Sequence, residues 1–268
     1  MSSANPEYSW NAKDYAKHST NQYEWAKELI PKLELSGSET LLDIGCGDGK
    51  VTATLAKYLQ NGKAVGIDSS QEMITLARRS FPSGSYPNLS FTKMDARKLT
   101  FKEQFDVAFS NAALHWIVNH KPVLLGVRNS LKSSGRLLFQ MAGKGNAKDV
   151  IAVFEAMQRE EKWKPNFAEF SFPYGFYSPE EYKQWLREAG LKPERVELVP
   201  KDMKLQGKEG LAGWIRTTWL PFTERVPSHL RAAFVAEIAD RYLAAHPSDE
   251  VGVVHIEMTR LEIQATKA

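Results

Sequence analysis

The feature that most constrains the fold is a glycine loop between a short apolar run and a helix-like segment. The apolar run is Thr40–Ile44, the loop contains Gly45, Gly47 and Gly49, and a helical pattern begins at Val51. Apolar residues bounded by glycine indicate a buried strand. Glycines let the backbone approach a ligand closely, and the N-terminus of a helix favours negatively charged groups. The stretch therefore predicts a strand, a turn and a helix that together form a cradle for a cofactor.

The spacing of the glycines favours one class of cofactor over another. A dinucleotide-binding loop has the pattern G-x-G-x-x-G, whereas here Lys50 stands at the third glycine position. Asp43, two residues before Gly45, would repel a pyrophosphate but could pair with an amino group of a ligand. S-adenosyl-L-methionine, which carries an ammonium and a sulfonium, suits this arrangement better. A nicotinamide-dependent dehydrogenase is the disfavoured alternative.

The motif Asp43–Gly49 resembles the glycine motif of the class I S-adenosylmethionine-dependent methyltransferases. This resemblance implies S-adenosyl-L-methionine as cofactor and S-adenosyl-L-homocysteine as its product. Cys46 lies inside the loop and is expected to be a small buried side chain rather than a catalytic thiol.

Two further carboxylates end predicted strands. Asp68 closes the apolar run Lys63–Asp68, about 20 residues beyond the glycines, where it can accept hydrogen bonds from ribose hydroxyls. Asp95 follows the run Leu89–Met94; in related methyltransferases this acid binds the adenine amino group, and its alternative role is to cap a turn. The complete set of expected cofactor contacts is Asp43, Gly45, Cys46, Gly47, Gly49, Asp68, Ser69, Asp95, Ala96 and Asn111.

Apolar runs and helical patterns alternate along the chain. Five predicted strands separated by helices are followed by a sixth, at about Arg195–Val199, and by the alternating run His255–Ala265, which we expect to be antiparallel. This order predicts an α/β fold with a doubly wound, seven-stranded, mostly parallel sheet, as in the Rossmann-like class I methyltransferases. We expect one methyltransferase domain over residues 1–268, an N-terminal lid segment at 1–35, and a helical cap at 207–247 between the last two strands.

The residues after the fourth predicted strand should face the methyl acceptor. They include Asn111, His115 and Trp116. Methyl transfer from a sulfonium is a direct displacement, so the protein mainly aligns donor and acceptor and excludes water. A carboxylate is ionised at neutral pH and needs no base, whereas a phenol or an ammonium must first lose a proton. His115 is the leading candidate base for a hydroxyl, amine or carbon acceptor; a packing role is its alternative.

Shorter matches favour a carboxylate acceptor. Gln22 and Leu114–Ile117 resemble the juvenile hormone acid methyltransferases, while Asn111–Trp116 and Trp214–Thr218 resemble the trans-aconitate methyltransferases. Both families form methyl esters of free carboxylic acids. The resemblance implies that Gln22 and Trp116 donate N–H groups to the substrate carboxylate.

Three further residues are candidate pocket residues. Tyr177 and Trp214 could line the pocket, although aromatic residues more often build core. Arg216 could neutralise a second carboxylate, or lie in solvent. The expected catalytic residues are therefore Gln22, Trp116 and His115, and the expected substrate contacts are Gln22, Trp116, Tyr177, Trp214 and Arg216.

Composition limits the partners, metals and cellular locations that can be expected for this protein. The 35 basic and 32 acidic residues give a net charge of +3 without long charged blocks, so nucleic acid is not expected as a partner. One cysteine and no apolar run near the ~20 residues of a membrane span predict a cytoplasmic protein that has no membrane partner, and the lack of an acidic cluster with ligand spacing predicts no metal. A small-molecule acid as substrate is what the resemblance to the two families of carboxylate methyltransferases implies. A cofactor-binding protein without catalysis is the alternative outside the enzymes.

Overall fold

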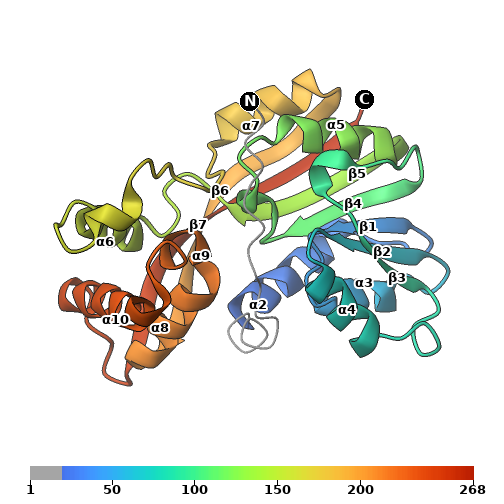
Figure 1. The fold of residues 1–268 in the computed structure, drawn as a ribbon. Helices are drawn as coiled ribbons and strands as arrows, with labels where there is room; N and C mark the ends of the chain where they lie inside the picture. The colour runs from blue at the N-terminus through green and yellow to red at the C-terminus, as the bar shows by residue number, and fades with distance from the viewer. Residues whose placement is uncertain (1–19) are drawn as a thin grey trace. The chain divides into compact units, whose positions relative to one another are not determined.

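A seven-stranded sheet dominates the computed structural model, which describes residues 20–268 (Figure 1). The strands follow the spatial order β3-β2-β1-β4-β5-β7-β6. Their bounds are β1 Thr40–Ile44, β2 Lys63–Asp68, β3 Leu89–Lys93, β4 Phe105–Asn111, β5 Leu131–Ala142, β6 Leu191–Gln206 and β7 Val253–Lys267.

Strand direction confirms the expected fold class. β1 pairs in parallel with β2 and β4, β2 with β3, and β4 with β5. β7 pairs antiparallel with β5, so that Leu138 lies opposite Gln264. The chain starts at the centre of the sheet with β1, builds outward to β3, and then returns to β4 on the other side, as doubly wound sheets do.

The chain divides into two units. The sheet unit contains Gln22–Lys144, Tyr174–Val199 and Arg260–Ala268, and the helical unit contains Gly145–Pro173 and Pro200–Thr259. The helices of the sheet unit are α2 Thr20–Leu29, α3 Lys50–Tyr58, α4 Gln71–Ser80, α5 Lys121–Ser130 and α7 Pro179–Glu188, with short 3-10 helices η1 Ile30–Leu33, η2 Ala96–Lys98 and η3 Leu114–Trp116.

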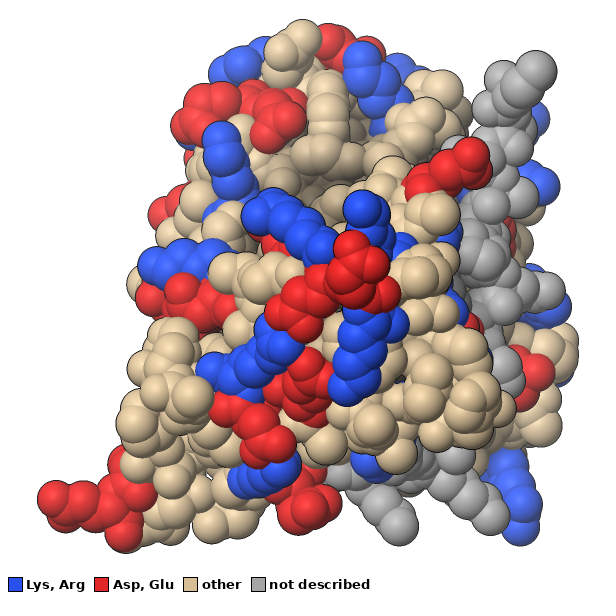
Figure 2. All heavy atoms as spheres, turned by 60° about the vertical axis from the view of Figure 1, so that its left-hand side comes forward, with Lys and Arg blue, Asp and Glu red and all other residues tan. Residues whose placement is uncertain are grey.

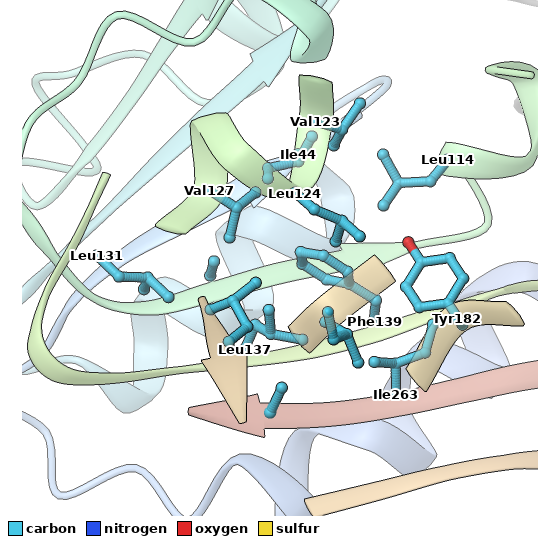
Figure 3. Packing of buried hydrophobic residues seen from close by; sticks show 14 of the residues in the cluster. Ile44, Leu114, Val123, Leu124, Val127, Leu131, Leu137, Phe139, Tyr182 and Ile263 are labelled. Carbon is cyan, nitrogen blue, oxygen red and sulfur yellow. The ribbon is translucent and has the colours of Figure 1, made fainter. Parts of the chain in front are cut away.

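Successive residues of the central strands point to opposite faces of the sheet, and helices cover both. Leu41 belongs to a buried cluster with side chains of α2, α3 and α4, whereas Leu42 belongs to a cluster with side chains of α5 and α7. Figure 3 shows the second cluster, which contains Leu124 of α5, Phe139 of β5 and Tyr182 of α7. Burial on both faces explains why these strands are apolar without a polar alternation.

Helix caps fix where two helices begin. The Ser70 hydroxyl accepts a hydrogen bond from Met73 N at 3.2 Å, and Ser178 forms a capping box with Glu181. The strand β5 begins at Leu131, before the segment Ser133-Ser134-Gly135. Its pairing with β4 is irregular there, and Ser134 has φ 63°, so the Ser-Ser-Gly segment bends the strand without ending it.

The helical unit has an aromatic core of its own. Phe154 lies 4.3 Å from Phe222 between ring centroids, and Trp163 lies 4.9 Å from Phe234. On the face shown in Figure 2, Lys and Arg lie beside Asp and Glu, in keeping with ion pairs such as Lys162–Glu237 at 2.8 Å. The helices of this unit are α6 Lys148–Gln158, η4 Lys164–Phe167, α8 Gly207–Thr218, α9 Leu220–Thr223 and α10 Ser228–Ala245.

Candidate active site

The three glycines of the loop after β1 all have positive φ, but they face different surroundings. A Cβ at Gly45 would lie 2.2 Å from Ala113 Cβ, and one at Gly49 would lie 2.7 Å from the ring of Phe91. A Cβ at Gly47 would meet nothing within 4 Å. The outer glycines therefore permit close packing, whereas the backbone at Gly47 borders open space that a ligand can approach.

Asp43 is a buried carboxylate beside this loop. Its side chain accepts a hydrogen bond from the Thr52 hydroxyl on α3 at 2.6 Å. Burial raises the pKa of Asp43 to about 7, and the charge of Asp68 adds to the rise. A cation placed beside Asp43 would stabilise its ionised form, so the site fits the amino group of S-adenosyl-L-methionine.

Asp68 links the glycine loop to the turn before α4. One carboxylate oxygen accepts Gly47 N at 3.0 Å, and the other accepts Ser70 N at 2.8 Å. Burial raises the pKa of Asp68 despite these hydrogen bonds. Each carboxylate oxygen can accept a further hydrogen bond. Ser69, in the same turn, is exposed.

Asp95 has a closer partner than the sequence indicated. It caps η2 by accepting Arg97 N at 2.8 Å, and the Arg97 guanidinium pairs with both carboxylate oxygens, at 2.6 to 3.0 Å. Arg97 holds the pKa of Asp95 below its usual value against the opposing effect of burial. The capping alternative is therefore realised, and a bond to an adenine amino group would use a remaining lone pair. Ala96 is the first residue of η2.

The segment after β4 places His115 among aromatic rings. Its ring lies 5.8 Å from Trp116, 6.2 Å from Tyr174 and 6.2 Å from Phe176 between centroids. The His115 carbonyl accepts Gly175 N at 2.8 Å, which joins the two segments. Asn111, the last residue of β4, lies opposite Gln140 of β5.

His115 is held in its neutral form. Burial lowers its pKa well below the usual value, and the positive charge of Arg260 lowers it further. Its Nδ1 is buried and, among residues 20–268, has no hydrogen-bond partner. His120, nearby on the chain, is fully engaged by the Tyr182 hydroxyl and the Leu114 carbonyl, and burial lowers its pKa to about 4.

The other expected residues are spread over both units. The Tyr177 hydroxyl donates a hydrogen bond to the Val118 carbonyl. Trp214 and Arg216 are on α8 of the helical unit, where Trp214 is buried 5.7 Å from the ring of Trp219 and Arg216 is exposed. Gln22 is in α2, but its side chain lies outside the described residues, as do residues 1–19 of the expected lid segment.

Sequence reasoning missed Arg260 of β7, which is 3% exposed. Its guanidinium lies 5.2 Å from the ring centre of Trp25 on α2. A signal was present, because the alternation of β7 puts Arg260 in phase with the buried Ile256 and Met258. A charged residue at an apolar position of such a pattern marks a buried polar group.

The described part of the chain contains neither a membrane-spanning helix nor a cluster of metal ligands. No helix between residues 20 and 268 is long and apolar enough to cross a membrane. The same residues contain no group of three or more His, Cys, Asp or Glu side chains that could hold a metal ion.

Comparison with known proteins gives the family. A model described as a methyltransferase domain matches residues 35–190, more than half of the chain. An uncharacterised methyltransferase of Schizosaccharomyces pombe is 33% identical over 217 residues, which cover 79% of this chain and 81% of that protein. A trans-aconitate 2-methyltransferase of Streptomyces avermitilis is 27% identical over 252 residues, which cover 92% of this chain and 93% of that protein.

Solved structures agree on the fold. YcgJ of Bacillus subtilis has a TM-score of 0.62 at 16% identity, covering 91% of this chain and 98% of that one. A phosphoethanolamine N-methyltransferase 2 of Haemonchus contortus, solved with S-adenosyl-L-methionine, has a TM-score of 0.61 at 16% identity, covering 96% and 56%. The chain belongs to the methyltransferase family. It is an S-adenosyl-L-methionine-dependent enzyme, as the glycine motif predicts.

Proposed function

We propose that this methyltransferase esterifies the carboxylate of a small-molecule acid. The observation that carries the proposal is the state of His115, the side chain best placed to act as a base after β4. A base must become positively charged during the reaction, and both burial and the charge of Arg260 oppose that in His115. An acceptor that arrives already ionised avoids this step, and a carboxylate is such an acceptor at neutral pH.

Relatives support the same acceptor. The trans-aconitate 2-methyltransferases of Streptomyces avermitilis and Methylobacterium nodulans are each 27% identical to this chain, over 92% and 96% of its length. We transfer from them only the chemical class of the acceptor, a carboxylic acid.

The proposed donor site uses the carboxylates and the glycine loop of the sheet unit. Asp43 pairs with the ammonium of the cofactor, Asp68 accepts its ribose hydroxyls, and Asp95 accepts its adenine amino group. Bound S-adenosyl-L-methionine supplies an electrophilic methyl group. The remaining proposed contacts are Gly45, Cys46, Gly47, Gly49, Ser69, Ala96 and Asn111.

The proposed acceptor site orients one carboxylate oxygen toward that methyl group. Trp116 donates its indole N–H and Gln22 its amide N–H to the carboxylate. Both donors are uncharged, so they position the anion without the loss of nucleophilicity that a tight ion pair would cause. Tyr177 is proposed to line the pocket of this site.

The test is transfer of labelled methyl from S-adenosyl-L-methionine to a panel of fatty, isoprenoid and polycarboxylic acids. Label that mild base releases as methanol identifies a methyl ester, which is the expected product. Stable label on hydroxyl, amine or carbon acceptors would contradict the proposal and give His115 the role of base. Cofactor binding without transfer to any acceptor would indicate a non-catalytic protein.

A further inference from the structure

His120 is a buried histidine whose two ring nitrogens are both engaged. It stands at the N-terminus of α5, and 1% of its surface is exposed. Nε2 lies 2.9 Å from the Leu114 carbonyl oxygen, and Nδ1 lies 3.0 Å from the Tyr182 hydroxyl oxygen. Buried polar groups are costly unless they are hydrogen-bonded, so both partners are needed for a histidine at this depth. His120 is not among the proposed contacts to the cofactor or to the acid.

The partners of His120 fix the position of its proton. A carbonyl oxygen can only accept, so Nε2 carries the hydrogen and donates it to Leu114. Nδ1 must then accept, so the Tyr182 hydroxyl donates to it. Burial lowers the pKa of His120 to about 4 and raises the pKa of Tyr182. Both groups therefore stay neutral around neutral pH, and the direction of the two hydrogen bonds is constant.

The carbonyl that His120 holds closes a short turn at the proposed acceptor site. Leu114 is the first residue of η3, which also contains His115 and Trp116. The same carbonyl accepts Ile117 N at 2.9 Å, the hydrogen bond that ends this turn. A 3-10 turn of three residues has few internal hydrogen bonds, and their geometry is poorer than in an α-helix. The direction of Trp116 therefore depends on groups that hold the turn from outside.

A second outside group supports the same turn. Gly175 N donates a hydrogen bond to the His115 carbonyl at 2.8 Å. A Cβ at Gly175 would lie 2.6 Å from the Ile117 carbonyl oxygen, so the close approach of this segment requires a glycine. His120 is anchored more deeply, because its own partner, Tyr182 on α7, is fully buried.

We propose that His120 is a positioning residue for methyl transfer, which links the buried Tyr182 hydroxyl to the Leu114 carbonyl and thereby orients Trp116 toward the acceptor. This inference rests on the proposed function, in which the Trp116 indole N–H binds the reacting carboxylate. In this role His120 touches neither the acceptor nor the cofactor, and no proton moves through it. Its effect is geometric, because a small displacement of an orienting group slows a reaction that depends on alignment.

Two substitutions of His120 separate positioning from packing. Glutamine can place an amide N–H where Nε2–H lies, whereas asparagine is one bond shorter and reaches only the position of Nδ1. His120→Asn should therefore lower kcat/KM for the acid by about tenfold, and His120→Gln should stay within about threefold of the wild type. Both should bind S-adenosyl-L-homocysteine with unchanged affinity. A merely structural histidine would lower the melting temperature in both variants and leave kcat/KM of the folded protein unchanged, which would overturn the inference.

A milder substitution tests the anchor on α7. Tyr182→Phe removes only the hydroxyl that donates to His120 and should lower kcat/KM for the acid by about threefold. Tyr242→Phe is the matched control, because this buried tyrosine donates to the His255 carbonyl at 2.8 Å within the helical unit. Its kcat/KM should equal that of the wild type. The same kcat/KM in the two variants would contradict the link through Tyr182.

A double-mutant cycle tests whether His120 acts through Trp116. In a Trp116→Phe background, His120→Asn should lower kcat/KM by less than about twofold, because the group that His120 positions is already absent. Losses that multiply would show that His120 acts independently of Trp116, and the inference would fall.

A measurement without turnover distinguishes this inference from the proposed function. In protein labelled with nitrogen-15 at tryptophan and loaded with S-adenosyl-L-homocysteine, the indole resonance of Trp116 is identified by its absence in Trp116→Phe. It should shift in His120→Asn and stay near its wild-type position in His120→Gln, while the resonance of Trp163 stays in place in both. An unmoved Trp116 resonance in His120→Asn would overturn the inference. If it moves but no acid is methylated, the proposed function fails and the hold of His120 on Trp116 stands.

Discussion

The proposed donor end and the proposed acceptor end of the candidate site consist of different kinds of residue. The proposed donor end consists of a glycine loop and carboxylates that accept short, local hydrogen bonds, from the Thr52 hydroxyl to Asp43 and from Gly47 N to Asp68. The proposed acceptor end contains aromatic rings around His115, whose pKa is lowered by burial and by the charge of the buried Arg260. The first arrangement attracts a cation, and the second holds a neutral base candidate beside a positive charge. This difference suggests that the enzyme binds a positive donor and a negative acceptor and leaves proton transfer out of the reaction.

The largest expected effect is at the donor end, where packing is tightest. Gly45→Ala places a Cβ 2.2 Å from Ala113 Cβ at φ 75° and should lower the free energy of unfolding by about 3 kcal/mol. Gly47→Ala, with φ 52° and open space around it, should lower it by only about 1 kcal/mol. Urea denaturation measures both values. Equal losses would contradict the account of the loop.

Asp43→Asn should separate binding from stability at the donor end. The substitution removes the charge that we propose faces the cofactor ammonium, so affinity for S-adenosyl-L-homocysteine should fall by about a hundredfold. The melting temperature should not fall, because burial already disfavours the ionised form of Asp43. Calorimetry and thermal unfolding give the two quantities. Unchanged affinity would exclude Asp43 from the donor site.

Trp116→Phe should affect only the acceptor end. It removes the indole N–H and keeps a ring beside Tyr174, at present 5.0 Å away between centroids. We expect kcat/KM for the acid to fall by about tenfold, with affinity for S-adenosyl-L-homocysteine unchanged. Trp163→Phe is the matched control, because it removes an indole N–H that bonds Glu237 in the helical unit. A loss of cofactor affinity in Trp116→Phe would break the separation of the two ends.

The smallest effect is the pH dependence of donor binding. The pKa of Asp43 is raised to about 7 in the protein without cofactor, so protonation below that pH competes with the cofactor cation. Affinity for S-adenosyl-L-homocysteine should therefore fall about tenfold at most from pH 7 to pH 6 and change little above pH 8. The dependence should vanish in Asp43→Asn. Affinity that rises as the pH falls would be the opposite of this linkage.

The raised pKa of Asp43 also determines how the free energy of unfolding changes with pH. Asp43 in the unfolded chain has the lower, ordinary pKa, so the folded protein without cofactor holds the extra proton between the two values. The contribution of Asp43 to stability is therefore most favourable at low pH and declines as the pH rises toward 7. Bound cofactor should oppose this decline.

The donor end of the candidate site can be predicted from the sequence more fully than the acceptor end, and the reason is physical. The donor end depends on residues between 40 and 68 and on local turn geometry, so the positions of Asp43, the glycines and Asp68 follow from short patterns. The capping box at Ser178 was predictable in the same way. The doubly wound, seven-stranded sheet followed from the alternation of strands and helices.

The acceptor end depends on long-range neighbours. His115 meets the charge of Arg260 because β7 inserts beside β5, and no pattern near either residue states which strands will be adjacent. The pairing of Asp95 with Arg97 depends on a side-chain conformation that spacing does not set. The Tyr177 hydroxyl likewise donates its hydrogen bond to a carbonyl distant in sequence, that of Val118.

The most direct test of the central claim is the pH dependence of kcat with both substrates saturating. Because a carboxylate needs no base and His115 stays neutral, kcat should be constant within about twofold from pH 6 to pH 9. His115→Asn should keep the same flat profile. A kcat that falls about tenfold per unit below neutral pH, and that collapses in His115→Asn, would show that the enzyme removes a proton from its acceptor.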